Sequence, residues 1–338
     1  MTISIAMATY NGEKYIETQL SSLLRQTRPP DEVIIQDDCS TDKTPDMVRG
    51  FIAEHGLSSW HFAANEKNQG FVGNFRTALR LATGDLIALC DQDDEWYPEK
   101  LAAVESVFAR TPDARAVNTS FDFIDREGKV IPASPEKRTA NHNLIRRRLT
   151  PGELAPVTFP EVIASNISPG CTLTVTRALA REYLARTEGV LPHDWELNLC
   201  AARRGGLYFY NVPLIGYRIH GDNAIGLPTK KTDLLHVPAR FKDRPIILRE
   251  QLRQTRFLRD PRITGGATRR QLTALHQFEQ YIACRSDALS RRRLAPWLRA
   301  WGYLGALRCG RSKVFWKVRS RALLGDLYYL WEERKKHG

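Results

Sequence analysis

Four polar residues, Asp91-Gln92-Asp93-Asp94, directly follow the apolar run Leu86–Cys90. Carboxylates this close repel one another unless a cation or hydrogen-bond donors neutralise them. Oxygen ligands favour Mg²⁺ or Mn²⁺, and such an ion bridges and stabilises diphosphate groups. The same pattern is typical of a solvated acidic turn before the helix expected near Pro98, and the four residues alone do not distinguish the two interpretations.

Polar clusters also follow three earlier apolar runs that read as buried strands. They are Thr9–Gly12 after Ile3–Ala8, Asp37–Asp42 after Glu32–Gln36, and Asn68–Gly70 after Trp60–Ala64. Helical periodicity separates the runs, and this alternation predicts a parallel α/β sheet. Because the carboxyl ends of parallel strands lie on one edge, we expect the four clusters to meet in one crevice.

A further carboxylate, Asp194, lies in His193-Asp194-Trp195 where a helix is expected to begin after Pro192. An aspartate at this position is typical of a helix N-cap. It is equally suited to act as a general base, because a carboxylate of ordinary pKa is ionised at neutral pH. The residues by themselves leave both interpretations open.

Seven segments in the same order resemble family 2 glycosyltransferases, in particular the bacterial rhamnosyltransferase-like members. They are Ala8–Gly12, Gln36–Asp42, Asn68–Gly70, Asp91–Asp94 with Trp96, Gly170–Thr172, His193–Trp195 and Tyr217–Gly221. The resemblance covers residues 1–226, about two-thirds of the chain. It implies an α/β GT-A nucleotide-diphospho-sugar transferase fold, a Rossmann-like mixed sheet with flanking helices. It also implies inverting sugar transfer from a nucleotide-diphosphate sugar, with dTDP-rhamnose as the expected donor and a surface polysaccharide or lipid-linked oligosaccharide as acceptor.

The resemblance also assigns roles to single residues. Nucleotide binding is expected of Thr9, Tyr10, Asn11, Glu13, Asp38, Asn68, Asn74, Asp91 and Gln92. A divalent ion, Mg²⁺ or Mn²⁺, is expected on Asp93 and His220, and Asp194 is expected to be the general base. The acceptor side is expected to include Gly170, Cys171, His193, Trp195 and Arg218, and Arg218 also suits the stabilisation of a departing diphosphate. Helix capping, turn formation and ordinary packing remain open for Asp38, Asn68 and His220.

The second part of the chain differs in charge. Residues 231–338 contain 25 Lys/Arg and 9 Asp/Glu, a net of +16, so the whole-chain +12 leaves −4 for residues 1–230. We expect residues 227–338 to form a basic helical region, with interruptions near Gly302 and Gly310. This pattern fits three roles for the region: docking on an anionic membrane, covering the first domain, or forming a homodimer.

Composition and spacing exclude several classes. The six cysteines have no CxxC or zinc-like spacing, no apolar run reaches ~18 residues, and residues 1–12 lack a signal pattern. We therefore expect a cytoplasmic protein, which would be peripheral at the plasma membrane if its C-terminal region docks there. A separate expectation from composition is that Pro132–Pro160 forms a mobile loop. Thr9–Gly12 is too poor in glycine for a nucleotidyltransferase phosphate loop. A function in binding nucleic acid would leave the clustered carboxylates unexplained. A catalytically silent regulator that only binds a sugar nucleotide would need no general base such as Asp194.

Overall fold

The computed structural model describes residues 1–131, 149–163, 166–185, 191–219, 244–306 and 313–335. Two compact units divide the chain. Unit 1 comprises residues 1–157 and 166–224, and unit 2 comprises residues 158–165 and 225–338.

Unit 1 is built on a mixed sheet whose described strands run in the order β3-β2-β1-β4-β8-β6-β9-β5, with β7 paired to β9. The strands are β1 Ile3–Thr9, β2 Glu32–Asp37, β3 Trp60–Ala64, β4 Leu86–Asp91, β5 Glu95–Trp96, β6 Ala116–Ile124, β7 Leu154–Pro156, β8 Leu173–Thr176 and β9 Leu207–Arg218. The first four in spatial order are parallel, while β8 is antiparallel to β4 and β6. The predicted mixed α/β sheet with flanking helices is confirmed.

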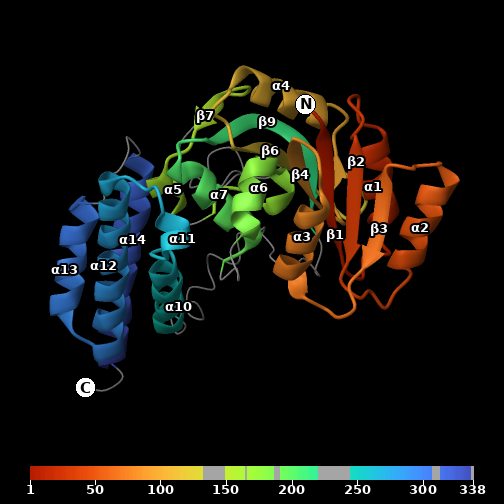
Figure 1. The fold of residues 1–338 in the computed structure, drawn as a ribbon. Coiled ribbons are helices and arrows are strands. Elements are labelled where there is room, and N and C mark those ends of the chain that lie inside the picture. Colours follow the sequence, from red (N-terminus) through yellow and green to blue (C-terminus); the bar gives the residue numbers. More distant parts are fainter. Residues whose placement is uncertain (132–148, 164–165, 186–190, 220–243, 307–312, 336–338) are drawn as a thin grey trace. The chain divides into compact units, whose positions relative to one another are not determined.

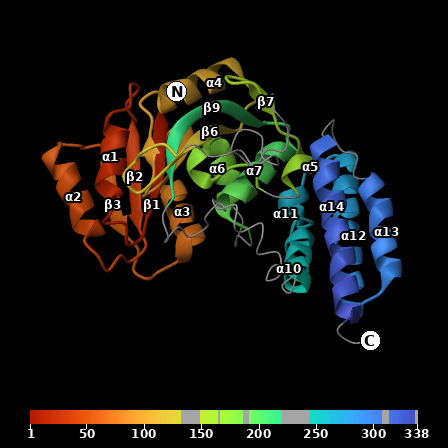
Figure 2. The ribbon, with the colours of Figure 1, turned by 180° about the vertical axis from the view of Figure 1, so that it is seen from behind.

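Helices cover both faces of this sheet. They are α1 Ile16–Leu24, α2 Thr44–Glu54, α3 Gly70–Leu81, α4 Lys100–Arg110, α6 Arg177–Leu184 and α7 His193–Arg203. Helices α3, α6 and α7 pack against one another on one side, and α1 packs against α2 on the other (Figures 1 and 2). Because both faces are covered, β1 is buried almost throughout and reads as a continuous apolar run rather than an alternating one.

Strand β9 and the segment before α5 depart from the sequence-based expectations. The apolar pattern does not predict the twelve-residue β9, because Asn211 and Pro213 interrupt its run of apolar residues. Proline has no N–H for the ladder, and the register with β6 shifts where Pro213 pairs with Ser120. Residues 132–148 of the expected loop lie outside the described residues, whereas its end forms β7 and the start of α5.

Unit 2 is helical, as expected for the C-terminal region. Its helices are α5 Phe159–Val162, α10 Arg244–Phe257, α11 Pro261–Thr264, α12 Arg269–Arg291, α13 Leu294–Ala306 and α14 Lys313–Lys335. The fully buried Asp326 accepts hydrogen bonds from Nε of Arg244 at 2.7 Å and Nε of Arg285 at 2.6 Å. This carboxylate therefore ties α10, α12 and α14 together.

Helix continuity in unit 2 corrects one expectation. Gly302 lies inside α13 and does not interrupt it, because apolar residues on both sides of the glycine pack that helix into the bundle. Gly310 lies outside the described residues. Within the described part of the chain, no helix is long and apolar enough to cross a membrane.

Candidate active site

The ends of four parallel strands lie side by side at one edge of the sheet. The register pairs Thr9 with Asp37, Asp37 with Ala64, and Ala8 with Asp91. The polar clusters that follow β1, β2, β3 and β4 are therefore brought to a common edge, which is where ligands bind in open α/β sheets.

The loop after β1 is held by the loop after β2. Thr9 Oγ1 donates to Asp37 Oδ1 at 2.8 Å, and Asn11 Oδ1 accepts from the Thr41 amide at 2.8 Å. Glu13 Oε2 accepts from the amide of Lys43 at 3.1 Å. Three of the residues expected to bind nucleotide thus hold these two loops together through side-chain hydrogen bonds.

Asp38 is the centre of the polar network at the end of β2. Its side chain is 3% exposed, and Oδ1 accepts from Asn65 Nδ2 and from the Gln69 amide, both at 2.8 Å. Asn68 Nδ2 donates to the Asp38 carbonyl at 3.1 Å. The carboxylate is consequently fixed in orientation, which a hydrogen-bonding partner for a nucleotide base requires.

Asn74 braces the two central strand ends from below. Its Nδ2 donates to the carbonyl oxygens of Gln36 at 2.9 Å and Thr9 at 3.3 Å, and its Oδ1 accepts from Asn65 Nδ2 at 2.9 Å. The side chain is 2% exposed. The Asn74 side chain therefore supports the carboxyl ends of β1 and β2 from within the protein.

The side chain of Gln92 clamps the loop after β1. Its Oε1 accepts from the Tyr10 amide at 2.7 Å and its Nε2 donates to the Tyr10 carbonyl at 2.8 Å. A Cβ at Gly12 would lie 2.4 Å from Gln92 Oε1, so only glycine leaves room for this clamp. The Tyr10 side chain, 49% exposed, is left free to face a ligand at the strand edge.

Three groups that can ligate a metal, Asp91, Asp94 and Cys171, have ligand atoms within 4.8 Å of one another. Burial raises the pKa of Asp94 to about 7, with the charge of Asp93 adding to it. Burial and the charges of Asp94, Asp93 and Asp194 raise the pKa of Asp91 well above its usual value. In the part of the chain that the structure describes, Asp94 Oδ2 is buried without a hydrogen-bond partner. A divalent cation fits these residues, because it would neutralise clustered carboxylates and occupy an orphaned oxygen.

The proximity of Cys171 to the acidic cluster comes from tertiary packing. Cys171 lies in the short 3₁₀ helix η2, Gly170–Thr172, which packs on β4. Its carbonyl accepts a hydrogen bond from the buried Lys100 Nζ at 3.2 Å. Burial lowers the pKa of Lys100 to about 8, while the neighbouring cysteines and Asp94 oppose that shift. The side chain of Lys100 therefore lies close to the acidic cluster, on the side where η2 packs.

Arg218 holds the acidic loop in shape. Its Nε donates to the Asp93 carbonyl at 2.8 Å, and its backbone amide donates to Asp94 Oδ1 at 3.1 Å. A second guanidinium nitrogen donates to the carbonyls of Asp125 and Arg126. The side chain is 2% exposed. The guanidinium is thus engaged with main-chain oxygens beneath the loop.

Asp194 is the second residue of α7 and is almost completely buried. Burial raises the pKa of its carboxyl to about 6, although hydrogen bonds from the Trp195 amide and Asn166 favour the ionised form. Asn166 Nδ2 lies 2.6 Å from Asp194 Oδ2. Asn166 Oδ1 in turn accepts from Asn198 Nδ2 at 3.0 Å, and Asn118 Nδ2 donates to Asn198 Oδ1 at 2.8 Å. A chain of three amides therefore fixes this carboxylate.

His193 and Gly170 line the space beside Asp194. The His193 ring stacks on Phe75 with centroids 4.0 Å apart, and burial lowers its pKa to about 3, so the imidazole is neutral. Neither ring nitrogen has a hydrogen-bond partner among the described residues. A Cβ at Gly170 would lie 3.3 Å from His193 Nε2 and 3.4 Å from the Asp194 Cβ. Glycine thus allows η2 to approach the carboxylate closely.

Two other observations complete the placement of the expected residues. Trp195 is half-buried next to Asp194, whereas His220 lies outside the described residues. The group of three potential ligands contains Asp91, Asp94 and Cys171, not Asp93. Asp93 lies between two of these residues in sequence, and its carbonyl is held by Arg218.

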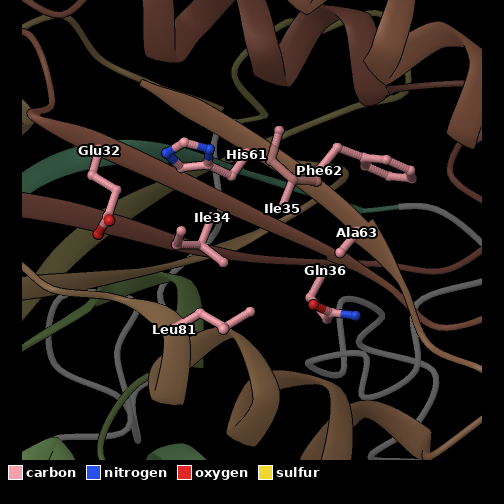
Figure 3. Close-up of a pocket in the computed structure, with 8 residues that line it drawn as sticks. All are labelled: Glu32, Ile34, Ile35, Gln36, His61, Phe62, Ala63 and Leu81. Atoms are coloured by element: carbon pink, nitrogen blue, oxygen red, sulfur yellow. The ribbon is translucent and has the colours of Figure 1, made fainter. Parts of the chain in front are cut away.

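A separate cavity of about 250 Å³ lies over β2 and β3 (Figure 3). Its lining residues are Glu32, Ile34, Ile35, Gln36, His61, Phe62, Ala63 and Leu81. Its walls are mainly apolar and include none of the acidic residues described above. We therefore build the candidate site on the strand edge and not on this cavity.

Sequence reasoning missed Asn65, Lys100, Asn166 and Asn198. Asn65 carries the same signal as its neighbours, because it directly follows β3. Asn198 lies on α7, where nearly every residue is buried and the helical period marks no polar face. Asn166 precedes η2 in irregular chain and has no signal of its own.

Comparison with known proteins bears on this geometry. Residues 4–160 match the family model described as glycosyl transferase family 2. Residues 4–160, just under half of the chain, thus carry a family 2 glycosyltransferase domain. The matched segment contains β1 to β7 with the loops that form the strand edge, whereas Gly170, Asp194 and Arg218 lie beyond it.

Individual relatives are similar over part of their length. An uncharacterised glycosyltransferase of Nostoc is 29% identical over 66% of this chain and 66% of its own. The dTDP-rhamnosyl transferase RfbG of Shigella flexneri is 26% identical over 65% of this chain and 73% of its own. The Escherichia coli enzyme WfgD, a UDP-Glc:alpha-D-GlcNAc-diphosphoundecaprenol beta-1,3-glucosyltransferase, is 38% identical over 41% of this chain and 53% of its own.

Solved structures show the same fold. Crystal structures of Staphylococcus aureus TarS 1–349 in complex with UDP and with UDP-GlcNAc match all of this chain and 92% of theirs. The TM-scores are 0.55 and 0.57 at 19% sequence identity. At that identity the likeness concerns the fold alone.

Proposed function

We propose that this protein is an inverting glycosyltransferase that uses Asp194 as its general base and a nucleotide-diphosphate sugar as donor. One observation carries the proposal: the buried carboxylate of Asp194, which Asn166 holds by a hydrogen bond, lies near enough to the acidic cluster to raise the pKa of Asp91. In this proposal the base and the edge that would bind the diphosphate are adjacent, as direct displacement at an anomeric carbon requires.

The chain's own residues divide the work of the reaction. The loops that carry Thr9, Tyr10, Asn11, Glu13 and Gln92 would hold the nucleotide. Asp38 would accept a hydrogen bond from the base, and Asn68 and Asn74 would support the floor beneath it.

Asp194 would remove the proton of the acceptor hydroxyl while that oxygen attacks the anomeric carbon from the face opposite the leaving diphosphate. Its pKa of about 6 leaves it ionised at neutral pH and makes it a stronger base than an exposed aspartate. His193, Trp195 and Gly170 would line the acceptor side.

We propose that a divalent cation, Mg²⁺ or Mn²⁺, is held by the carboxylates of Asp91–Asp94, with Asp93 and His220 as the predicted ligands. The grouping of Asp91, Asp94 and Cys171 supports a cation at this position. When bound, the ion would neutralise the two phosphates of the leaving group. Arg218 would hold the loop that presents these ligands.

The donor and acceptor are proposed from similarity. The relation to RfbG supports dTDP-rhamnose, and the higher identity to WfgD over a shorter stretch keeps UDP-sugars as the alternative. The name of WfgD describes an acceptor carried on diphosphoundecaprenol, a polyprenyl lipid, which supports a lipid-linked acceptor here. Work at the inner face of the plasma membrane would follow from such an acceptor.

A donor panel tests the proposal. The wild-type protein is incubated with dTDP-rhamnose, UDP-glucose, UDP-GlcNAc and GDP-mannose, with Mg²⁺ or Mn²⁺ and then with EDTA, and the released nucleoside diphosphate is measured. We expect release from one donor, lost with EDTA and in Asp93→Ala. Asp46→Asn is the matched control, because the Asp46 side chain is 90% exposed on α2. Turnover that EDTA leaves unchanged contradicts the metal proposal, and no turnover of any donor with lipid-linked acceptor present contradicts the transferase.

A further inference from the structure

Helix α14 has two opposite faces in its described part. Leu323, Asp326 and Leu330 are 0%, 0% and 3% exposed and form the inward face of the bundle. Trp297 Nε1 on α13 donates to the carbonyl of Leu323 at 2.8 Å, and Arg285 on α12 binds Asp326. The contacts of α14 with α12 and α13 are therefore made by this inward face.

The opposite face presents large apolar side chains to solvent. We call Leu324, Leu327, Tyr328 and Trp331 the outer stripe; they are 54%, 36%, 49% and 50% exposed. Their spacing of three, four and seven residues places them in one row along the helix. A row of this kind is unusual on a surface with no partner, because each side chain leaves apolar area in water.

Basic side chains surround the aromatic end of the outer stripe. Lys335 Nζ lies 3.4 Å from the centroid of the Trp331 ring. Arg292 pairs with Glu333 at 3.1 Å, which brings the exposed run Arg291–Arg293 beside the same helix end. Five basic residues (291, 292, 293, 334 and 335) and three acidic ones (287, 332 and 333) lie in these segments, a net of +2.

The net charge of the sequence that contains this helix selects the occupant. Residues 231–338 carry a net of +16, so two copies meeting through this face would bring like charges together. An anionic lipid surface complements that charge, and it takes up leucine side chains while tyrosine and tryptophan remain at headgroup depth. A nucleic acid would satisfy the charge but offers little for a row of leucines.

We propose that the outer stripe and the basic residues at its end bind the surface of a membrane rich in anionic lipid. The stripe enters the headgroup region, and the arginines and Lys335 contact lipid phosphates. This inference deepens the proposed function by naming a partner, but it does not depend on catalysis, because vesicle binding is measured without any sugar donor.

Co-sedimentation of the full chain with vesicles tests the inference. Phosphatidylcholine vesicles are compared with vesicles that also contain phosphatidylglycerol, at low and high salt. We expect binding to the anionic vesicles alone, weakened by salt. The double variant Leu327→Ser/Trp331→Ser should bind at least about tenfold more weakly, because it removes two of the four apolar contacts. Arg293→Glu/Lys335→Glu should weaken binding about tenfold or more through charge alone.

Matched controls separate the inference from general effects. Leu272 on α12 is 44% exposed and lies outside the stripe, so Leu272→Ser should bind as wild type does. Thermal unfolding of each variant shows whether the bundle is intact. Equal binding of the stripe variant and wild type overturns the inference, as does equal binding to neutral vesicles. A wild-type dimer that the stripe variant converts to monomer assigns the face to a second copy, and displacement from vesicles by single-stranded RNA at the stripe assigns it to nucleic acid.

Discussion

The hydrogen bond between Asn166 and Asp194 controls, in our account, the pH at which the protein becomes active. Asn166 Nδ2 donates to Asp194 Oδ2 at 2.6 Å and so stabilises the ionised carboxylate. Asn166→Leu keeps the approximate shape of the side chain and removes this donor. The bond from the Trp195 amide then remains as compensation for burial without that from Asn166, and the pKa of the carboxyl must rise above the present value of about 6.

The size of the shift follows from the strength of the bond. A hydrogen bond to a charged group contributes about 1.5–3 kcal/mol, and one pKa unit corresponds to about 1.36 kcal/mol. The pKa of Asp194 should therefore rise by about 1–2 units in the variant. Because the base acts in its ionised form, kcat/KM falls as the pH drops below that pKa. The acid limb of the profile should move from near pH 6 to roughly pH 7–8.

The assay is kcat/KM for the released nucleoside diphosphate as a function of pH, with saturating metal ion. Asn211→Leu is the control, because Asn211 is another buried asparagine of unit 1 whose side chain binds main-chain carbonyls, those of Leu149 and Thr150. That variant should lose stability without moving the acid limb. An unmoved acid limb in Asn166→Leu, or a shift to lower pH, would refute the reasoning.

Three further predictions concern stability and geometry. The Asp194 carboxyl ionises at 3.8 when unfolded and at about 6 when folded, so stability falls as the pH rises between these values. Asp194→Asn should accordingly raise the free energy of unfolding at pH 8 by up to about 3 kcal/mol and leave it unchanged at pH 4, as urea titrations can show. Asn74→Ala removes the side-chain donor to the buried carbonyls of Gln36 and Thr9 and should lower that free energy by about 1–3 kcal/mol, together with weaker nucleotide binding by calorimetry. Gly170→Ala should lower kcat/KM by at least about tenfold with an unfolding transition near that of wild type; normal turnover would show that η2 tolerates a methyl group.

The sequence predicts the strand edge well because the relevant signal is local. A polar cluster after an apolar run marks the carboxyl end of a strand, and parallel pairing then requires the ends of β1, β2 and β4 to meet. This reasoning found Asp38, Gln92 and Asp91 without knowledge of the tertiary structure. It also predicted the helical C-terminal region from the arginine-rich periodicity.

Contacts between distant segments were beyond such reasoning. Cys171 lies beside Asp94 because η2 packs on β4, and no local pattern encodes that contact. Asn166 belongs to irregular chain, so nothing in its neighbours indicates a bond to Asp194. Arg218 was expected at the diphosphate or acceptor, and the structure shows its guanidinium bound to main-chain oxygens of the acidic loop.

The most direct test of the central claim compares donor binding and turnover in wild type and Asp194→Asn. Calorimetry gives the dissociation constant of the donor identified in the panel, and single-turnover kinetics gives the rate of transfer. Our account predicts an unchanged dissociation constant and a transfer rate lower by about 10²–10⁴-fold, because the substitution removes a general base and leaves the nucleotide loops intact. A variant that transfers sugar at the wild-type rate would contradict the assignment of Asp194.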